Sequence, residues 1–402
     1  MSSVVDFDAL GQFVEVPDAA RRLLSNPEKE IHFALSLKTS DYELLEGNCY
    51  VVYHCTARGP GKGGLRMSAD ATLDETRRLA ELMSLKTALA GIPFGGAKSC
   101  LSIDPSRLNR FEKTAVIKEY VHMLRLELEH GNYVPAPDMG TGPTDMAVIF
   151  GETHIPESVT GKPPRVGGLP GRLEATGRSV SKAALLGLER LLRKPSSGAT
   201  AAVQGYGNVG SHTAMFLSEA GVKVVAACDI AGGVYNSDGI DTKALKDHVG
   251  KEGSTKGFTG GDQITNAELL GLDVDLLLPC AREDVINAAN ARDVRAALVV
   301  EGANGPTTPE AEAILSEKSV RIVPDILANA GGVIASYVEW RKAKSGALTT
   351  KEETFELIDD RISSAFDDMM RMCKDKSCSL RMASFAIAVE ELVQAMRDRA
   401  WI

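Results

Sequence analysis

Apolar residues in the first third of the chain recur mostly at helical spacing. Residues 1–47, 73–90 and 111–130 place apolar side chains three or four positions apart, so each segment is expected to be helical. Residues 49–57 instead form a dense apolar run, CYVVYHCTA, which predicts a strand. This part of the chain therefore predicts a domain that mixes helices and strands.

Short apolar strands alternate with helical segments in the second half of the chain. A helix is expected over 179–192, and Thr308 with Pro309 suits the start of a later helix. The apolar runs expected to be strands are 201–203, 222–227, 274–278, 297–300 and 320–323. This alternation is typical of a parallel, doubly wound sheet, and the C-terminal segment that follows has apolar stripes at helical spacing.

A segment rich in glycine and proline, residues 160–177, interrupts these patterns and is interpreted as a junction between domains. We expect an α/β fold with two domains separated by a cleft. Residues 1–178, completed by C-terminal helices over 350–402, would form an α/β substrate-binding and oligomerisation domain. Residues 179–349 would form a Rossmann-like, doubly wound dinucleotide-binding domain.

Composition narrows the class of protein. The 402 residues are 44% hydrophobic and 25% charged, as in a soluble globular protein of about two domains. A net charge of −9 and the lack of a long basic run argue against nucleic acid or a membrane as a partner. No apolar run is long enough to span a membrane, and no signal peptide is recognisable. Seven cysteines without a CxxC pair predict a reducing, cytoplasmic location, no disulfide framework and no metal site.

Residues 201–229 read as a strand, a glycine loop, a helix, a second strand and a terminal acid. In the loop, Gly205 allows a tight turn, Gly207 lets the backbone approach a pyrophosphate, and Gly210 lets the helix pack closely on the strand. The helix N-terminus offers free N–H groups to the phosphates. Asp229 falls where an acid would hold the ribose hydroxyls. A dinucleotide site is favoured, and a glycine-rich turn in an ordinary α/β domain is the alternative.

Three lysines and one aspartate stand in unusual settings in the N-terminal half. Lys62 lies among glycines in GPGKGGLR, Lys86 lies on the apolar face of its helix, and Lys98 follows PFGGA. Lysine is rarely buried without a partner, and these three lie within 37 residues, so a shared pocket for an anionic substrate is favoured. Asp138, in PAPDMG, is a candidate for the same pocket. A solvated lysine or a turn-capping aspartate is the simpler alternative for each residue alone.

Eight sequence blocks together carry a family resemblance. In chain order they read GPGKGGLR, LMSLKTALAGIPFGGAK, VPAPDMGTG, TGKP, EATGR, QGYGNVG, VEGANGPTTPEA and ILANAGGVIASYVEW. Over residues 45–400 the chain resembles the glutamate dehydrogenases of the Glu/Leu/Phe/Val dehydrogenase superfamily. The resemblance implies NAD(P)-dependent oxidative deamination of L-glutamate to 2-oxoglutarate and ammonium, the reverse amination, and a homohexamer.

The resemblance also implies a role for each matched residue. Lys98 matches the catalytic lysine, and Asp138 matches the aspartate that exchanges protons with the amino group. The residues matched to substrate contacts are Lys62 and Ser336 at the distal carboxylate, Lys86 at the α-carboxylate, and Met83 and Pro137 lining the pocket. The residues expected at the dinucleotide are Thr176, Gly205, Gly207, Asn208, Val209, Gly210 and Asp229, with Asn304 and Asn329 near the nicotinamide.

The chemistry of oxidative deamination suits these residue types. The reaction needs a base near neutral pH and a separate proton shuttle, and a lysine beside other cations in a water-poor cleft has its pKa lowered toward that range. Lys98 is expected to be such a lysine, with Asp138 as the shuttle. Lys62 and Ser336 favour glutamate, because a buried lysine without a distal carboxylate would be left unpaired.

Two departures from the family pattern leave other substrates open. Ser99 and Cys100 stand where two glycines usually follow GGAK, and Leu169 and Pro170 replace a usual Ser-Leu pair. The alternative is a dehydrogenase of the same superfamily for another L-amino acid, whether branched-chain, aromatic or other. A non-catalytic regulatory subunit is a third possibility, against which the two retained catalytic side chains argue.

The choice between NAD and NADP depends on the second strand of the dinucleotide motif. Asp229 would bind ribose hydroxyls and repel a 2′-phosphate. No arginine or lysine occurs from Ile230 to Gly239 to bind that phosphate. NAD is therefore the favoured cofactor, with NADP as the alternative.

Overall fold

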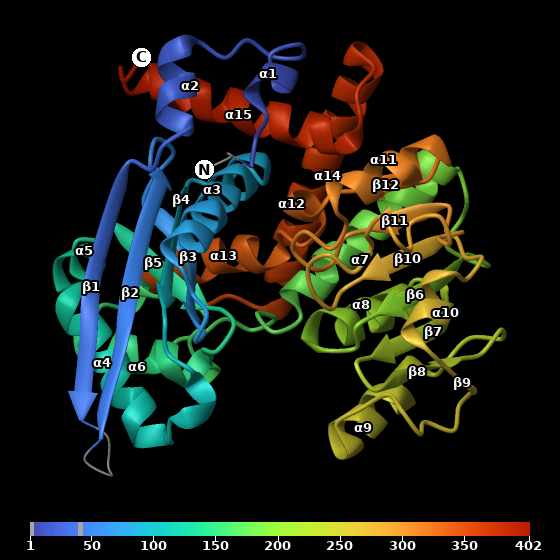
Figure 1. Cartoon of the computed structure of the whole chain (residues 1–402), viewed down its shortest axis with the longest axis horizontal. Coiled ribbons are helices and arrows are strands. Elements are labelled where there is room, and N and C mark those ends of the chain that lie inside the picture. Colours follow the sequence, from blue (N-terminus) through green and yellow to red (C-terminus); the bar gives the residue numbers. More distant parts are fainter. Residues whose placement is uncertain (1–3, 39–42) are drawn as a thin grey trace. The chain divides into compact units, whose positions relative to one another are not determined.

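The computed structural model describes residues 4–38 and 43–402, which fold as two compact units (Figure 1). Unit 1 comprises the chain up to Arg172, together with Val333–Thr354 and Phe385–Ile402. Unit 2 comprises Leu173–Gly332 and Phe355–Ser384. The C-terminal helices are thus divided between the units, whereas the sequence assigns all of 350–402 to the first domain. The division into a substrate-binding domain and a dinucleotide-binding domain stays a prediction.

Unit 1 contains a five-stranded sheet in the order β1-β2-β4-β3-β5. Its strands are β1 Lys29–Lys38, β2 Leu44–Cys55, β3 Gly61–Met67, β4 Gly95–Leu101 and β5 Tyr133–Pro137. β1, β2 and β4 pair antiparallel, whereas β4, β3 and β5 run parallel. In the three parallel strands, Lys62 lies on β3, Lys98 lies on β4, and Asp138 directly follows β5. Neighbouring strands therefore bring these sequence blocks together.

Helices surround this sheet, and their ends follow capping chemistry. Thr72 accepts the N–H of Glu75 at the start of α3, and Asn109 and Glu112 form a capping box on α4. The helices are α1 Phe7–Leu10, α2 Asp18–Leu24, α3 Leu73–Leu89, α4 Arg110–Met123, α5 Arg125–Glu129, α6 Pro143–Thr153, and the 3₁₀ turns η1 Pro105–Arg107, η2 Pro156–Ser158 and η3 Pro164–Val166. Helices α13 Gly331–Ser345, α14 Lys351–Lys376 and α15 Leu380–Asp398 each have residues in both units.

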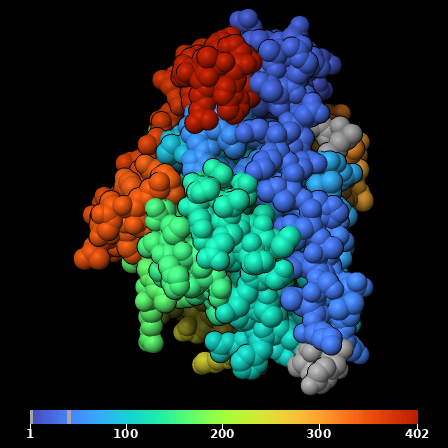
Figure 2. Space-filling model, turned by 90° about the vertical axis from the view of Figure 1, so that its left-hand side faces the viewer, coloured from blue at the N-terminus to red at the C-terminus, as the bar shows by residue number. Residues whose placement is uncertain are grey.

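The expectation of a helical segment over residues 1–47 is confirmed only in the short helices α1 and α2, and it is wrong where β1 and the start of β2 form. Residues 1–3 and 39–42 of that segment lie outside the described part of the chain. β1 pairs with β2 in unbroken register through the described part of this hairpin. Along β1, alternate residues Ile31, Phe33, Leu35 and Leu37 pack on the core of unit 1, which is the two-residue period of a strand. Figure 2 shows the outer side of this strand, in blue, beside the α4–α5 segment in teal.

Unit 2 contains the expected Rossmann-like sheet, in the order β12-β11-β10-β6-β7-β8-β9. The first five strands run parallel, and β8 and β9 extend the sheet antiparallel. The strands are β6 Thr200–Gln204, β7 Lys223–Asp229, β8 Gly232–Tyr235, β9 Asp262–Ile264, β10 Leu276–Pro279, β11 Leu298–Val300 and β12 Arg321–Val323. The helices are α7 Ala175–Gly187, η4 Leu188–Leu192, α8 Asn208–Glu219, α9 Thr242–Glu252, α10 Asn266–Leu270, α11 Pro309–Glu317, α12 Asp325–Ala328 and α14 Lys351–Lys376.

The strand order of unit 2 reverses direction between β6 and β10. From β6 the chain continues to β7 on one side, and later returns to β10 on the other. In open α/β sheets, ligands bind beyond the carboxyl ends of strands at such a switch point. The α/β class and the doubly wound sheet expected from the sequence are confirmed, and the fold places a binding site at the loops after β6 and β10.

Candidate active site

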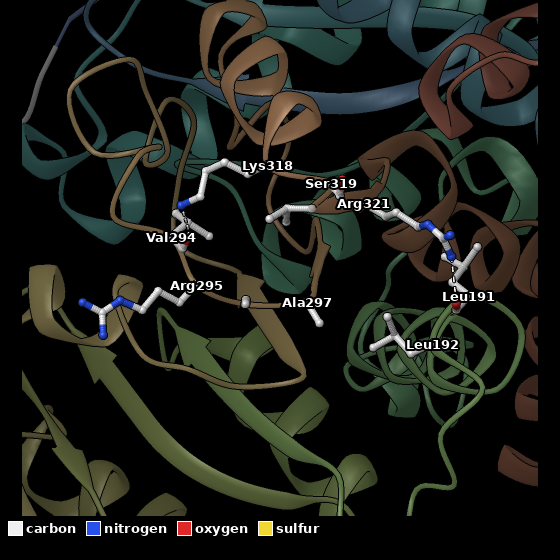
Figure 3. Close-up of a pocket in the computed structure, with 10 residues that line it drawn as sticks. Leu191, Leu192, Val294, Arg295, Ala297, Lys318, Ser319 and Arg321 are labelled. Carbon is white, nitrogen blue, oxygen red and sulfur yellow. Dashed lines mark hydrogen bonds between the residues drawn. The ribbon is translucent and has the colours of Figure 1, made fainter.

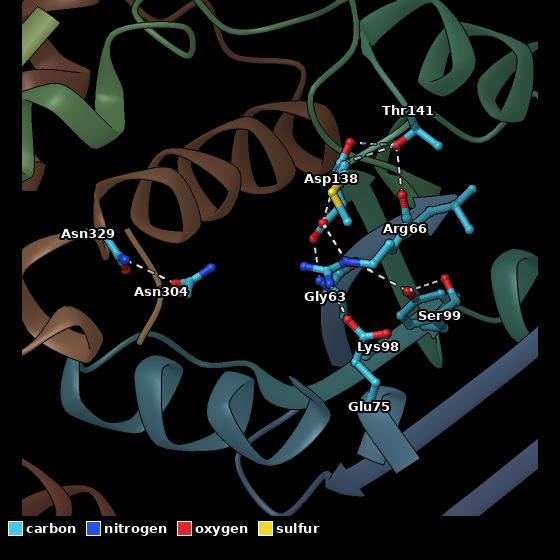
Figure 4. A network of polar contacts seen from close by, with 12 residues as sticks. Gly63, Arg66, Glu75, Lys98, Ser99, Asp138, Thr141, Asn304 and Asn329 are labelled. Atoms are coloured by element: carbon cyan, nitrogen blue, oxygen red, sulfur yellow. Dashed lines mark hydrogen bonds and ion pairs between the residues drawn. The ribbon is translucent and has the colours of Figure 1, made fainter. Parts of the chain in front are cut away.

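A buried lysine and an aspartate form an ion pair at the carboxyl edge of the parallel strands of unit 1 (Figure 4). Lys98 Nζ, on β4, contacts Asp138 Oδ2, immediately after β5. Arg66, on β3, places its Nε 3.3 Å from Asp138 Oδ1 and also pairs with Glu75. The sequence predicts the first two as partners in one pocket, and adjacent strands bring them together. It misses Arg66, although this residue ends the GPGKGGLR block.

The backbone around Asp138 fixes its carboxylate. The N–H of Met139 donates to Asp138 Oδ1 at 2.7 Å, and the N–H of Asp138 donates to Thr141 Oγ1 at 3.0 Å. A Cβ at Gly64 would lie 2.4 Å from Asp138 Oδ2, so the glycine is needed for this approach. Burial raises the pKa of Asp138, but Lys98 and Arg66 outweigh it and hold the pKa below its usual value.

Lys98 lies within a regular strand, and the unusual Ser99 after it is accommodated by hydrogen bonds. β4 runs unbroken through Gly95–Leu101. Ser99 Oγ lies 2.8 Å from the Tyr133 hydroxyl and 3.1 Å from the Tyr120 hydroxyl. Tyr133 in turn donates to the carbonyl of Gly63 at 3.2 Å. These bonds join β4, β3 and β5 beneath the ion pair, so Ser99 supports the strand that carries Lys98.

A second cationic group lies around Lys62 on β3. Lys62 is 1% exposed, and its pKa lies well below the usual value because of burial first and Arg172 next. Among the described residues, no carboxylate lies within ion-pair distance of Lys62. The Nε of Arg172 is also buried and has no hydrogen-bond partner in the described chain. Lys62 therefore has no carboxylate partner in the part of the chain that the structure describes, and the neighbouring Arg172 has a donor without an acceptor there.

A buried ion pair borders this cationic group. Glu339, on α13, is fully buried, pairs with Lys162 at 2.9 Å, and accepts the N–H of Gly161. The charge of Glu339 raises the pKa of Lys62, but less strongly than burial lowers it. Ser336 is 2% exposed and lies one turn before Glu339 on the same helix face. Ser336 and Glu339 therefore share one face of α13.

The remaining substrate candidates lie on the elements that flank these strands. Lys86 and Met83 lie one turn apart on α3, and both are partly exposed. α3 packs closely on β4, since a Cβ at Gly96 would collide with the backbone of Ser84. Pro137 ends β5 beside the catalytic aspartate candidate. All substrate-site candidates therefore belong to unit 1.

The glycine loop of unit 2 has the geometry expected for a dinucleotide site. Gly205 has a φ of 91°, and a Cβ on it would lie 2.6 Å from the backbone nitrogen of Ala281, after β10. A Cβ at Gly210 would lie 1.8 Å from the Gly205 carbonyl oxygen, so α8 packs tightly on the loop. At Gly207 no atom lies within 4 Å of a hypothetical Cβ, which leaves room for a pyrophosphate. The residues present therefore fit a dinucleotide.

Other candidates for the dinucleotide surround this loop. Asn208 and Val209 begin α8, and the Asn208 side chain donates to the carbonyl of Leu173 at 2.8 Å, just before α7. Thr176 lies in the first turn of α7, which packs on α8. The structure thus brings the starts of both helices together, as a shared anion site requires.

Asp229 ends β7 and is held by the segment after α9. Its carboxylate accepts the N–H groups of Ala231 at 2.8 Å and Thr255 at 2.6 Å. Burial raises its pKa, but these hydrogen bonds outweigh it, so the pKa is lowered and the group is charged at neutral pH. Lys256 lines the adjoining surface pocket with Ile230. The sequence motif gives no sign of this distant cation.

The two asparagines assigned to the nicotinamide are hydrogen-bonded to each other (Figure 4). Asn329 Nδ2 donates to Asn304 Oδ1 at 3.0 Å and to the Ala303 carbonyl at 3.1 Å. The N–H groups of Gly302 and Ala303 both donate to the Pro279 carbonyl, which fixes this loop beside the end of β10. The asparagines therefore lie at the same strand edge as the glycine loop.

A separate pocket of unit 2 lies at the opposite strand ends (Figure 3). Its 470 Å³ are lined by residues that precede β11 and β12, including Arg295, Lys318 and Arg321. Lys318 donates to the Val294 carbonyl, and Arg321 donates to the Leu191 carbonyl at 2.7 Å. Because the pocket lies away from the carboxyl ends, it is not the dinucleotide site.

The described residues contain no group of three or more His, Cys, Asp or Glu side chains placed to hold a metal ion. All seven cysteines are free thiols. No helix within 4–38 and 43–402 has the length and apolar character to cross a membrane.

A doubly wound unit with a dinucleotide loop and a unit with a buried cluster of cations define a nicotinamide-dependent dehydrogenase with an anionic substrate. Two family models match the chain. The Glu/Leu/Phe/Val dehydrogenase dimerisation domain matches residues 27–155, and the Glutamate/Leucine/Phenylalanine/Valine dehydrogenase domain matches residues 167–400. The chain belongs to the Glu/Leu/Phe/Val dehydrogenase family, and it is an NAD(P)-dependent amino acid dehydrogenase.

Characterised relatives extend this similarity over nearly the whole chain. The glutamate dehydrogenase of Thermotoga maritima is 38% identical over 407 aligned residues, covering 99% of this chain and 97% of the relative. The NADP-specific glutamate dehydrogenase of Saccharolobus shibatae is 40% identical, covering 94% of this chain and 90% of the relative. The leucine-bound, hetero-hexameric glutamate dehydrogenase of Thermus thermophilus is 32% identical with a TM-score of 0.91, covering 98% of this chain and 94% of that one.

Proposed function

We propose that this enzyme catalyses the oxidative deamination of L-glutamate and the reverse amination of 2-oxoglutarate. In the forward direction L-glutamate, water and NAD(P)⁺ give 2-oxoglutarate, ammonium, NAD(P)H and a proton. The observation that carries the choice of substrate is the buried Lys62, without a carboxylate partner and beside the unpartnered Nε of Arg172. A distal carboxylate would supply the missing charge. An apolar side chain would leave Lys62 and the Nε of Arg172 without a partner among the described residues, which is costly in a buried site.

The residues of unit 1 are proposed to hold the substrate at its two carboxylates and to line the space between them. In this proposal Lys62, Arg172 and Ser336 hold the distal carboxylate, and Lys86 holds the α-carboxylate. Met83 and Pro137 line the space between them. A substrate held at both ends presents its α-carbon and amino group in one orientation, which lowers the entropic part of the barrier.

Lys98 and Asp138 are proposed to move the protons. A bound nicotinamide would supply the acceptor for the hydride that leaves the α-carbon. The Lys98 ammonium, paired with Asp138, is placed to stabilise negative charge at the α-carbon oxygen as water adds. Asp138 takes a proton from the substrate amino group and returns it as ammonia leaves. Arg66 keeps Asp138 ionised and therefore able to accept that proton.

The decisive test offers 2-oxoglutarate, 2-oxoisocaproate and phenylpyruvate in turn, with ammonium and NADH or NADPH, and follows absorbance of the reduced nicotinamide. Turnover mainly of 2-oxoglutarate is expected. Turnover only of an apolar oxo acid would overturn the substrate proposal and favour a branched-chain or aromatic amino acid dehydrogenase. Binding of NADH without turnover of any oxo acid would favour a non-catalytic subunit.

NAD is proposed as the preferred dinucleotide, on the basis of the charged Asp229 at the end of β7. This carboxylate repels a 2′-phosphate, whereas it can accept a hydrogen bond from a ribose hydroxyl. We expect Asp229→Asn to raise the ratio of kcat/KM for NADP over NAD by about tenfold, because the repulsion is removed. An unchanged ratio, or a wild-type preference for NADP, would contradict this proposal and would favour Lys256 as a ligand of the 2′-phosphate.

The oligomer is proposed to be a homohexamer assembled partly through unit 1. β1 is an edge strand of its sheet, and such edges are sites of association. On the neighbouring α4–α5 segment, two apolar side chains lie largely in solvent: Phe111 is 84% exposed and Leu126 is 67% exposed. The family model covering this region describes a dimerisation domain.

Light scattering tests the assembly directly. The unmodified enzyme is expected at six times the chain mass, and the double variant Phe111→Asp with Leu126→Asp is expected to give smaller species, because charges disfavour an apolar contact. Leu348→Asp is a matched control, since Leu348 is even more exposed, at 93%, but lies after α13. A hexamer that persists in the double variant would exclude this surface, and a smaller wild-type particle would exclude the hexamer.

A further inference from the structure

Arg381, in the first turn of α15, joins three carboxylates of unit 2. Its Nη2 donates to Glu301 Oε1 at 2.8 Å, and its Nη1 lies 3.5 Å from Asp325 Oδ1. Its Nε donates to Glu312 on α11. A guanidinium has five donors in one plane and can bond several carboxylates at once, which a lysine ammonium does less well. Arg381 therefore ties together segments that follow β11 and β12.

Two of these carboxylates hold the backbone that carries the nicotinamide-side asparagines. Glu301 Oε2 accepts the N–H of Asp325 at 3.0 Å, and Asp325 Oδ2 accepts the N–H of Gly305 at 2.9 Å. Asn304 lies between Glu301 and Gly305 in the chain, and Asn329 ends the helix that Asp325 begins. The two asparagine side chains hydrogen-bond to each other, so a shift of either segment would move both amides.

The charge balance of this network depends on Arg381. Glu301 is fully buried and Asp325 is 4% exposed, so their repulsion is poorly screened by water. Burial raises the pKa of Glu301 to about 7, Arg381 opposes that rise, and Asp325 adds to it. Without the guanidinium, Glu301 would take up a proton or the two carboxylates would separate. Either change alters the bonds that they make to the loop and to α12.

We infer that Arg381 is a positioning residue for hydride transfer, which acts by fixing Glu301 and Asp325 and through them Asn304 and Asn329. This inference rests on the proposed function and on the role that the family resemblance implies for the two asparagines, beside the nicotinamide. It assigns this role to a residue of α15 that the proposed function does not place at the substrate or the dinucleotide.

The test compares Arg381→Lys with the unmodified enzyme in 2-oxoglutarate amination. We expect kcat to fall by about 10- to 100-fold, because a displaced nicotinamide lowers the fraction of reactive geometries. The KM for 2-oxoglutarate should be unchanged, since the substrate lysines lie in unit 1. Arg371→Met is the matched control: Arg371 pairs with Asp368 on α14, also in unit 2, and its loss should leave kcat unchanged.

A double-mutant cycle with Asn304→Ala separates positioning from a merely structural role. If Arg381 acts through the asparagines, Arg381→Lys lowers kcat much less in the Asn304→Ala background than in the unmodified enzyme. Independent effects that multiply, or a lowered melting temperature with kcat unchanged, would overturn the inference. If the unmodified enzyme prefers another oxo acid, the substrate proposal fails and the cycle is run with that acid. If it turns over none, the proposed function fails and the inference fails with it.

Discussion

Replacing Lys98 with methionine is expected to lower kcat for 2-oxoglutarate amination by about 10²- to 10⁴-fold, the usual size of a lost proton-transfer or charge-stabilising group. Methionine keeps the length and apolar stem of lysine but removes the ammonium that pairs with Asp138. NADH binding should be unchanged, because the dinucleotide candidates lie in unit 2. Stopped-flow measurement of NADH oxidation, together with NADH titration, checks both expectations.

The matched control for this variant is Lys113→Met. Lys113 forms another lysine–aspartate pair in unit 1, 2.9 Å from Asp145, but lies on α4 and outside the proposed pocket. Its loss should leave kcat unchanged, since partly exposed pairs contribute little. Retention of normal kcat in Lys98→Met would remove this lysine from the mechanism. Asp138→Asn should have a loss of the same order, and the two losses should not add, because the groups act as one unit.

Much of this site follows from the sequence because its residues lie on neighbouring strands or directly after them. The glycine loop, Asp229 and the short apolar segments that follow them along the chain predict a doubly wound sheet, since buried parallel strands are apolar throughout. The lysine blocks and PAPD are predicted to share one pocket, and the parallel trio β3, β4 and β5 brings Lys98 and Asp138 together.

The features that the sequence misses depend on partners far along the chain. The sequence does not predict β1, because its alternating apolar residues indicate a strand only beside β2 and because the helical spacing found before residue 24 is extended past it. The short, partly polar strands β8 and β9 have no clear apolar run. Arg172 is missed for another reason: nothing local shows that its Nε is buried beside Lys62. Whether a buried cation pairs with a carboxylate depends on tertiary packing, which the spacing of residues along the sequence does not show.

Lys62→Met is expected to lower kcat/KM for 2-oxoglutarate by about 10²- to 10³-fold, because a buried distal carboxylate would lose its charged partner. The same variant should raise kcat/KM for 2-oxoisocaproate, since an apolar side chain no longer meets an uncompensated ammonium. Assays of both oxo acids with one enzyme preparation give the ratio directly. Lys29→Met, which removes a half-exposed lysine of β1, is the control and should leave the ratio unchanged.

The lowered pKa of Lys62 adds a pH-dependent result to the same prediction. In the free enzyme, between this lowered pKa and the usual value of lysine, Lys62 is largely neutral. A bound carboxylate favours the charged form, so binding of 2-oxoglutarate in that pH range must take up a proton, and uptake must vanish below the lowered pKa. Calorimetric titration in buffers of different ionisation enthalpy counts these protons. Equal uptake in Lys62→Met would show that another group binds the proton, and would separate Lys62 from the distal carboxylate.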